Sequence, residues 1–144
     1  MSKAHFLNPN ARRVNRSLGD ATGLTGLGFH LIKVEPNHET TEVHVHHYED
    51  ECVYVLAGEA TAVIGDAEHA IGLGDFIGYR KGGLAHTIRN TGSTILRCIV
   101  VGERLPHDVC DYPDKGKRLF RIDRMDWNVV DRDAIENPKA GAKT

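Results

Sequence analysis

The sequence contains few of the residues that stabilise small secreted proteins or that mark membrane proteins. Its three cysteines are Cys52, Cys98 and Cys110, and no two of them have the Cys-x-x-Cys spacing of a zinc knuckle. Their odd number does not suggest a disulfide framework. No apolar run approaches the roughly 20 residues that a membrane-spanning helix needs, and the N-terminal residues lack the apolar core of a signal peptide. We therefore expect a cytoplasmic protein without a membrane partner.

An excess of charge of one sign is also missing. The chain has 18 Lys and Arg against 20 Asp and Glu, a net charge of −2. Binding to nucleic acid needs a basic face, so we expect no nucleic-acid partner. With 144 residues, of which 40% are hydrophobic, the chain has the size and composition of one globular domain.

The middle of the chain has the pattern of an all-β protein. Short runs rich in Val, Ile and Thr are separated by turn residues such as Gly58, Gly65-Asp66 and Gly82-Gly83. No helical pattern interrupts them, which argues against a parallel βαβ sheet. About eight strands at this spacing predict a β-sandwich or β-barrel, with strands at 27–34, 42–47, 52–56, 59–64, 69–71, 76–79, 86–89 and 94–101.

Changes in composition divide the chain into four segments. Residues 1–22 are polar and arginine-rich, and we expect an irregular N-terminal arm. Residues 23–102 form the predicted barrel. Residues 103–133 hold aromatic and charged residues, which suits a strap that packs on the barrel or a dimer contact. Residues 134–144 are polar and are expected to be a flexible tail.

Histidines and one glutamate have the spacing of a metal site. His44 and His46 are two residues apart in a predicted strand, so their imidazoles point to the same face. A four-residue loop then brings Glu51 back towards them, and His86 begins another strand after a glycine turn. Three imidazoles and one carboxylate suit one divalent Fe, Mn, Ni, Cu or Zn ion better than Ca or Mg. Four ligands leave two positions open for water or substrate on a six-coordinate ion.

Alternatives to this ligand set are open. The histidines would be merely structural if hydrogen bonds satisfied their rings. Glu49 or Asp50 would replace Glu51 if the loop had another register, although both also suit solvated loop acids. His47 alternates away from the other two histidines and should face out of the site.

Other residues are candidates for contacts with a substrate. Arg80 and Lys81 lie just before His86 and suit a phosphate or carboxylate at the barrel mouth, or else an exposed basic turn. Tyr48 and Glu51 are the candidate catalytic residues for moving protons. Further candidates for the cavity wall or for proton donation are His30, Lys33, Arg97, Tyr54 and Tyr79.

The motifs together resemble the cupins. His44, His46, Glu51 and Gly58 match the first cupin motif, and Gly74, Gly82, His86 and Asn90 match the second. The chain departs from the second motif at Arg80, where cupins usually have proline, which affects the expected shape of the loop. The resemblance covers roughly residues 28–101 and implies a jelly-roll barrel (a double-stranded β-helix), a small-molecule ligand inside it and a homodimer.

Two kinds of function follow from the resemblance. Some similar small bacterial cupins carry a provisional sugar-phosphate isomerase assignment. An enzyme would act on an oxygen-rich metabolite, such as a sugar phosphate or keto acid, as an isomerase, lyase or dioxygenase. A non-catalytic barrel would only bind or sense a small molecule. Acids or bases with shifted pKa values near the open metal positions would favour the enzyme.

Overall fold

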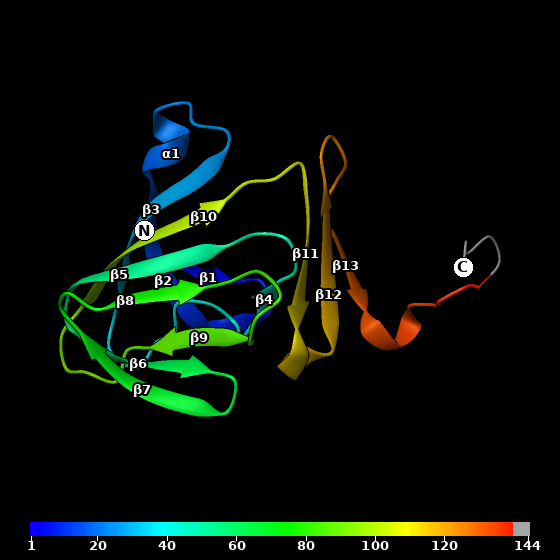
Figure 1. Cartoon of the computed structure of the whole chain (residues 1–144). Coiled ribbons are helices and arrows are strands. Elements are labelled where there is room, and N and C mark those ends of the chain that lie inside the picture. The colour runs from blue at the N-terminus through cyan, green and yellow to red at the C-terminus, as the bar shows by residue number, and fades with distance from the viewer. Residues whose placement is uncertain (140–144) are drawn as a thin grey trace.

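The structure is a computed structural model that describes residues 1–139 (Figure 1). Its strands are β1 (Lys3–His5), β2 (Asn8–Ser17), β3 (Leu27–Val34), β4 (Val45–His46), β5 (Glu51–Ala57), β6 (Glu59–Ile64), β7 (Ala67–Gly72), β8 (Phe76–Tyr79), β9 (His86–Arg89), β10 (Leu96–Glu103), β11 (His107–Tyr112), β12 (Lys117–Ile122) and β13 (Asn128–Asp131). Within residues 1–139 the helices are α1 (Leu18–Ala21) and two 3₁₀ turns, η1 (Pro113–Lys115) and η2 (Arg132–Ala134). The predicted all-β architecture is confirmed.

Two antiparallel sheets form the body of the fold. The larger has the order β1-β2-β3-β10-β5-β8, and the smaller has the order β7-β6-β9. Four predicted strands, at residues 27–34, 59–64, 76–79 and 86–89, have the predicted bounds. The predicted strand at 42–47 is shorter than expected: only Val45–His46 forms β4, and His44 makes an isolated bridge to His86.

Alternate residues of the central strands fill the core. Val53 and Val55 of β5 are almost fully buried, whereas Tyr54 and Leu56 between them are exposed. The same alternation buries Ile32 and Val34 of β3 and Leu96 and Cys98 of β10. Because side chains alternate between the faces of a strand, Glu51 at the start of β5 points to the same side as Val53. The core therefore continues into the candidate site at one end of the sheet.

The N-terminal residues differ from the irregular arm that we expected for 1–22. Most of them form β1 and β2, and β2 pairs with β3 from Val14↔Lys33 to Ser17↔His30. β2 has few apolar residues because only one of its residues, Ala11, enters the core. A strand with so little apolar surface gives no alternating hydrophobic pattern, which explains the wrong expectation.

The C-terminal residues build a further sheet. Strands β11, β12 and β13 pair in the order β13-β12-β11-β4, and Figure 1 shows them beside the main body (yellow to orange). Residues 103–133 thus pack against the barrel, as one of the two expectations had it, through the pairing of β11 with β4. Of the expected tail, residues 140–144 lie outside the described residues.

The described helices are all short. None in residues 1–139 has the length and apolar character needed to cross a membrane.

Candidate metal centre

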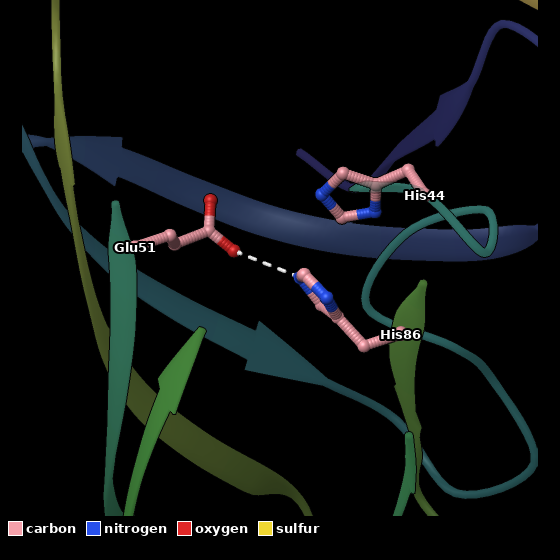
Figure 2. Close-up of side chains that lie close together, drawn as sticks. All are labelled: His44, Glu51 and His86. Carbon is pink, nitrogen blue, oxygen red and sulfur yellow. Dashed lines mark ion pairs between the residues drawn. The ribbon is translucent and has the colours of Figure 1, made fainter. Parts of the chain in front are cut away.

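Three side chains from separate parts of the chain converge at one end of the core. His86 Nε2 lies 3.6 Å from Glu51 Oε1, and the rings of His44 and His86 have centroids 4.7 Å apart. One ligand atom from each of these three residues lies within 4.8 Å of the other two. Figure 2 shows Glu51 pointing towards His86, with the ring of His44 beside them. A small cation fits between ligand atoms at this spacing.

Backbone pairing holds the two buried histidines together. The amide of His86 donates to the carbonyl of His44 at 2.9 Å, and the amide of His44 donates to the carbonyl of His86 at 3.2 Å. Gly82 has a φ of 65°, in the left-handed region, and donates its amide to the His46 carbonyl at 2.7 Å. The glycine turn therefore places β9 beside the first histidine segment.

Hydrogen bonds to the ring Nδ1 atoms leave the Nε2 atoms free. His44 Nδ1 lies 2.9 Å from the carbonyl oxygen of Glu42, and His86 Nδ1 lies 3.1 Å from that of Leu84. A carbonyl oxygen can only accept, so each Nδ1 carries the proton and each Nε2 keeps its lone pair. Within the described chain, His86 Nε2 is buried and has no hydrogen-bond partner. A buried lone pair without a donor suits a metal ion.

His46 joins the same group from the edge of the C-terminal sheet. Its Nε2 lies 3.9 Å from Glu51 Oε2, and its Nδ1 lies 2.5 Å from Asp108 Oδ2. Asp108 is buried in β11 and also accepts the amide of Tyr48 at 3.0 Å. This is the carboxylate–histidine arrangement that orients metal ligands in proteins. The four predicted ligands are thus brought together, and Asp108 supports one of them.

The protonation of His44 and Glu51 favours cation binding at neutral pH, whereas that of His46 opposes it. Burial lowers the pKa of His44 to about 4, so this ring is neutral. Burial alone would raise the pKa of Glu51, but His86 and the other two histidines lower it to about 2. The pKa of His46 is raised, because burial, which lowers it, is outweighed by the hydrogen bond to Asp108 and by nearby carboxylates. Deprotonated ligands are those that metals bind.

The centre opens into a cavity of about 750 Å³. Its wall includes all four ligands and Glu49, Asp108, Tyr112, Arg121 and Trp127 from the loop before β5 and from the C-terminal segment. A volume of this size lies within the range of small-molecule sites, roughly 300–1,000 Å³.

The other predicted site residues lie elsewhere. Arg80 and Lys81 are exposed and are not part of the cavity wall, which matches the other expectation for them, an exposed basic turn. Tyr48 is also outside the wall, with its ring against His107 at 5.5 Å between centroids. His47 faces away, as expected, and pairs with Asp111 at 2.9 Å.

The loop acids behave differently from each other. Asp50 is exposed, as expected, and accepts the amide of Lys81. Glu49 is buried rather than solvated, because its carboxylate accepts hydrogen bonds from the Leu105 amide and from Arg121. The sequence offered no signal for this, since both partners come from residues far along the chain.

The remaining candidates are divided between cavity, packing and surface. His30 lines the cavity, whereas Lys33, Arg97 and Tyr54 are exposed. Tyr79 is buried, and its ring stacks on His86 with 3.5 Å between centroids and 4° between planes. Its ring thus helps to fix the orientation of the His86 ring, and Tyr79 also lines the cavity. Asn90 of the second motif is structural, because its amide donates to the carbonyls of Val34 and Thr94.

Comparison with protein families gives a match to the cupin domain over residues 30–102. The chain belongs to the cupin family. No curated protein matches the chain. Among solved structures, this cupin is 49% identical to an Acidithiobacillus ferrooxidans protein provisionally named a sugar phosphate isomerase, with a TM-score of 0.90, covering 96% of this chain and 88% of that one. Similarity that covers nearly the whole chain includes the C-terminal sheet as well as the cupin motifs.

Two further solved structures are similar. A cupin-superfamily sugar phosphate isomerase from Silicibacter pomeroyi is 26% identical, with a TM-score of 0.85, covering 96% of this chain and 90% of that one. A predicted oxalate decarboxylase from Thermotoga maritima is 26% identical, with a TM-score of 0.55, covering 65% of this chain and 80% of that one. The latter similarity covers only part of this cupin.

Proposed function

We propose that this cupin is a metal-dependent enzyme that acts on a small oxygen-rich metabolite, and that its reaction is the isomerisation of a sugar phosphate. The observation that carries the proposal is the convergence of His44, His46, Glu51 and His86 on one cavity, with His86 Nε2 buried and unpaired among the described residues. The names of the two structures similar over nearly the whole chain support the choice of reaction.

The four ligands would hold one divalent Fe, Mn, Ni, Cu or Zn ion. Such an ion polarises a substrate carbonyl and so acidifies the neighbouring C–H bond. In an aldose–ketose isomerisation, one proton moves between C2 and C1 and another moves between the two oxygens. The His46 ring is held by Asp108, and the His44 and His86 rings are held by backbone carbonyls, so the ligand geometry is set before substrate binds.

The roles of the two candidate catalytic residues differ. Glu51 lines the cavity, and its pKa of about 2 suits a metal ligand better than a general base, whose pKa lies near the working pH. Tyr48 is outside the cavity wall and is not part of the proposed site. We assign Glu51 to the metal.

Elemental mass spectrometry of the purified protein tests the metal centre. We expect about one equivalent of a transition metal in the wild type and its loss in a His44→Ala/His86→Ala double variant. His69→Ala is the control, because His69 is an exposed residue of β7. Absence of stoichiometric metal, even after reconstitution, would contradict the proposal.

Proton exchange tests the reaction. Metal-loaded protein is incubated in D₂O with pentose and hexose phosphates, and ¹H NMR follows deuterium incorporation at C1 or C2 together with product formation. We expect deuterium exchange with the wild type and none with the His44→Ala/His86→Ala double variant. Binding of every sugar phosphate without exchange or turnover would contradict the isomerase and leave the alternative, a non-catalytic binding or sensing barrel.

The location is a separate prediction. We infer a cytoplasmic location, which agrees with the free thiols of Cys52, Cys98 and Cys110.

A further inference from the structure

The cavity contains a cation that the metal centre does not use. Four arginines line it, and three of them pair with carboxylates, as Arg104–Asp20, Arg121–Glu49 and Arg124–Asp123. The fourth is Arg13. Within residues 1–139 it makes no ion pair, and its side chain donates only one long hydrogen bond, from Nη1 to the Thr40 carbonyl at 3.4 Å. A guanidinium has five N–H donors, so most of its hydrogen-bonding capacity is unused.

Arg13 belongs to the strand that crosses behind the metal ligands. In Figure 2 the long blue ribbon of β2 passes behind Glu51 and His44. Ala11, two residues before Arg13, is buried in the core, so Arg13 shares the inward face of β2. On the same face, Asn15 Nδ2 lies 3.1 Å from His30 Nδ1. Arg13 therefore lines the same cavity as the four predicted ligands.

Among residues 1–139, no carboxylate lies within ion-pair distance of the Arg13 guanidinium, although the cavity wall contains acidic residues. Burial lowers the pKa of Arg13, and the charge of Glu51 opposes this in part. Arg13 in turn adds to the effect of burial in lowering the pKa values of His5 and His30. An arginine remains charged in proteins, and a charge taken out of water without a partner is costly. A metal ion bound to Glu51 would remove part of the remaining compensation.

We propose that Arg13 binds the anionic group of the substrate, a phosphate or carboxylate oxyanion, while the metal centre holds oxygens elsewhere in the same molecule. The planar guanidinium presents paired N–H donors that match two oxygens of such a group. This inference rests on the proposed function. It assigns to Arg13 the anion-binding role that the sequence suggested for Arg80 and Lys81. Substrates without an anionic group are then bound poorly.

NMR of the metal-free protein tests the site directly. The wild type is titrated with methyl phosphate and, separately, with acetate, and the Nε–Hε resonance of Arg13 is followed. We expect it to shift on saturation with at least one of the two anions. The anion bound more tightly identifies the group as phosphate or carboxylate. An unshifted Arg13 resonance with both anions would overturn the inference.

Affinities of variants give the second measurement. We expect Arg13→Gln to weaken binding of the preferred anion by at least about tenfold, because a charge-assisted pair is lost. Arg13→Lys keeps the positive charge but lacks the paired N–H donors of the guanidinium, so its affinity for the anion should lie between those of Arg13→Gln and the wild type. Arg16→Gln is the control, because Arg16 is an exposed residue of the same strand. Equal affinity of Arg13→Gln and wild type would overturn the inference.

The two proposals fail separately. The anion titrations use metal-free protein, so they report on Arg13 even if no metal binds. If the protein binds stoichiometric metal but its Arg13 resonance shifts with neither anion, the proposed metal centre stands and only the proposed anion site is contradicted.

Discussion

At the scale of single residues, the cavity combines ligands fixed by hydrogen bonds with groups whose pKa values are shifted. Among the proposed ligands, His46 depends on one side chain for its orientation, because Asp108 Oδ2 lies 2.5 Å from its Nδ1. His44 and His86 use backbone carbonyls for the same purpose. The sensitivity of the centre to substitution outside the ligands is therefore concentrated at Asp108.

Asp108→Asn should weaken metal binding while leaving all four ligands in place. Loss of such a supporting carboxylate typically costs about 10–100-fold in metal affinity. Competition with a chromogenic chelator measures the effect. Asp114→Asn, at an exposed position of η1, should bind metal like the wild type. Equal affinity of Asp108→Asn and wild type would show that His46 does not depend on this carboxylate.

The metal-free protein should be most stable near the ordinary pKa of histidine. The folded-state pKa of His44 is lowered from 6.5 to about 4 by burial, so the unfolded chain binds a proton there first. Stability therefore falls as the pH drops from 6.5 towards 4. The pKa of His46 is raised above 6.5, against burial, by Asp108. The contribution of His46 to the stability of the fold is complete below pH 6.5 and is lost as the pH rises through the raised pKa.

Urea unfolding between about pH 5 and pH 9 checks this dependence, because the free energy of unfolding follows the difference in bound protons. In Asp108→Asn, the decline above pH 6.5 should be smaller than in the wild type. If stability declines as much above pH 6.5 in Asp108→Asn as in the wild type, groups other than His46 cause the decline.

At the scale of elements, the C-terminal sheet completes the site. β11 supplies Asp108, and β12 supplies Arg121, which binds the buried carboxylate of Glu49 in the loop before β5. The loop that leads into Glu51 is thus held by a strand some 70 residues further along the chain. Residues 103–133 are part of the site as well as a covering for the barrel.

Arg121→Met should destabilise the protein by about 3–5 kcal/mol, because it leaves the Glu49 charge buried without its partner. Chemical denaturation measures the change in the free energy of unfolding. The double variant Arg121→Met/Glu49→Gln removes the charge as well and should be less destabilised. If the double variant loses as much as Arg121→Met plus Glu49→Gln taken singly, the two side chains are not coupled.

At the scale of the whole molecule, one face of the large sheet has an unusual number of exposed apolar residues. Tyr54 and Leu56 of β5 are 43% and 38% exposed, and Phe76 of β8, opposite Tyr54, is 66% exposed. β8 is also the last strand of its sheet. An apolar patch at a sheet edge marks a surface for association, which supports the proposed homodimer.

Analytical ultracentrifugation tests the dimer. We expect the wild type to sediment as a dimer and Tyr54→Lys to sediment as a monomer with an unchanged circular dichroism spectrum. His69→Ala, at an exposed position of β7 in the other sheet, should stay dimeric. A monomeric wild type, or a dimeric Tyr54→Lys variant, would show that this face is not the interface.

The sequence by itself determined the all-β fold, the bounds of four strands and the four predicted ligands that the structure brings together. These follow from local rules: the two-residue period of strands places His44 with His46 and Glu51 with Val53, and glycine turns mark where strands end. Only the tertiary structure placed Asp108, Arg121 and Arg13 around the centre and removed Arg80 and Lys81 from it. Such contacts join residues far apart in the chain through strand pairing and loop packing, for which spacing along a single sequence gives no signal.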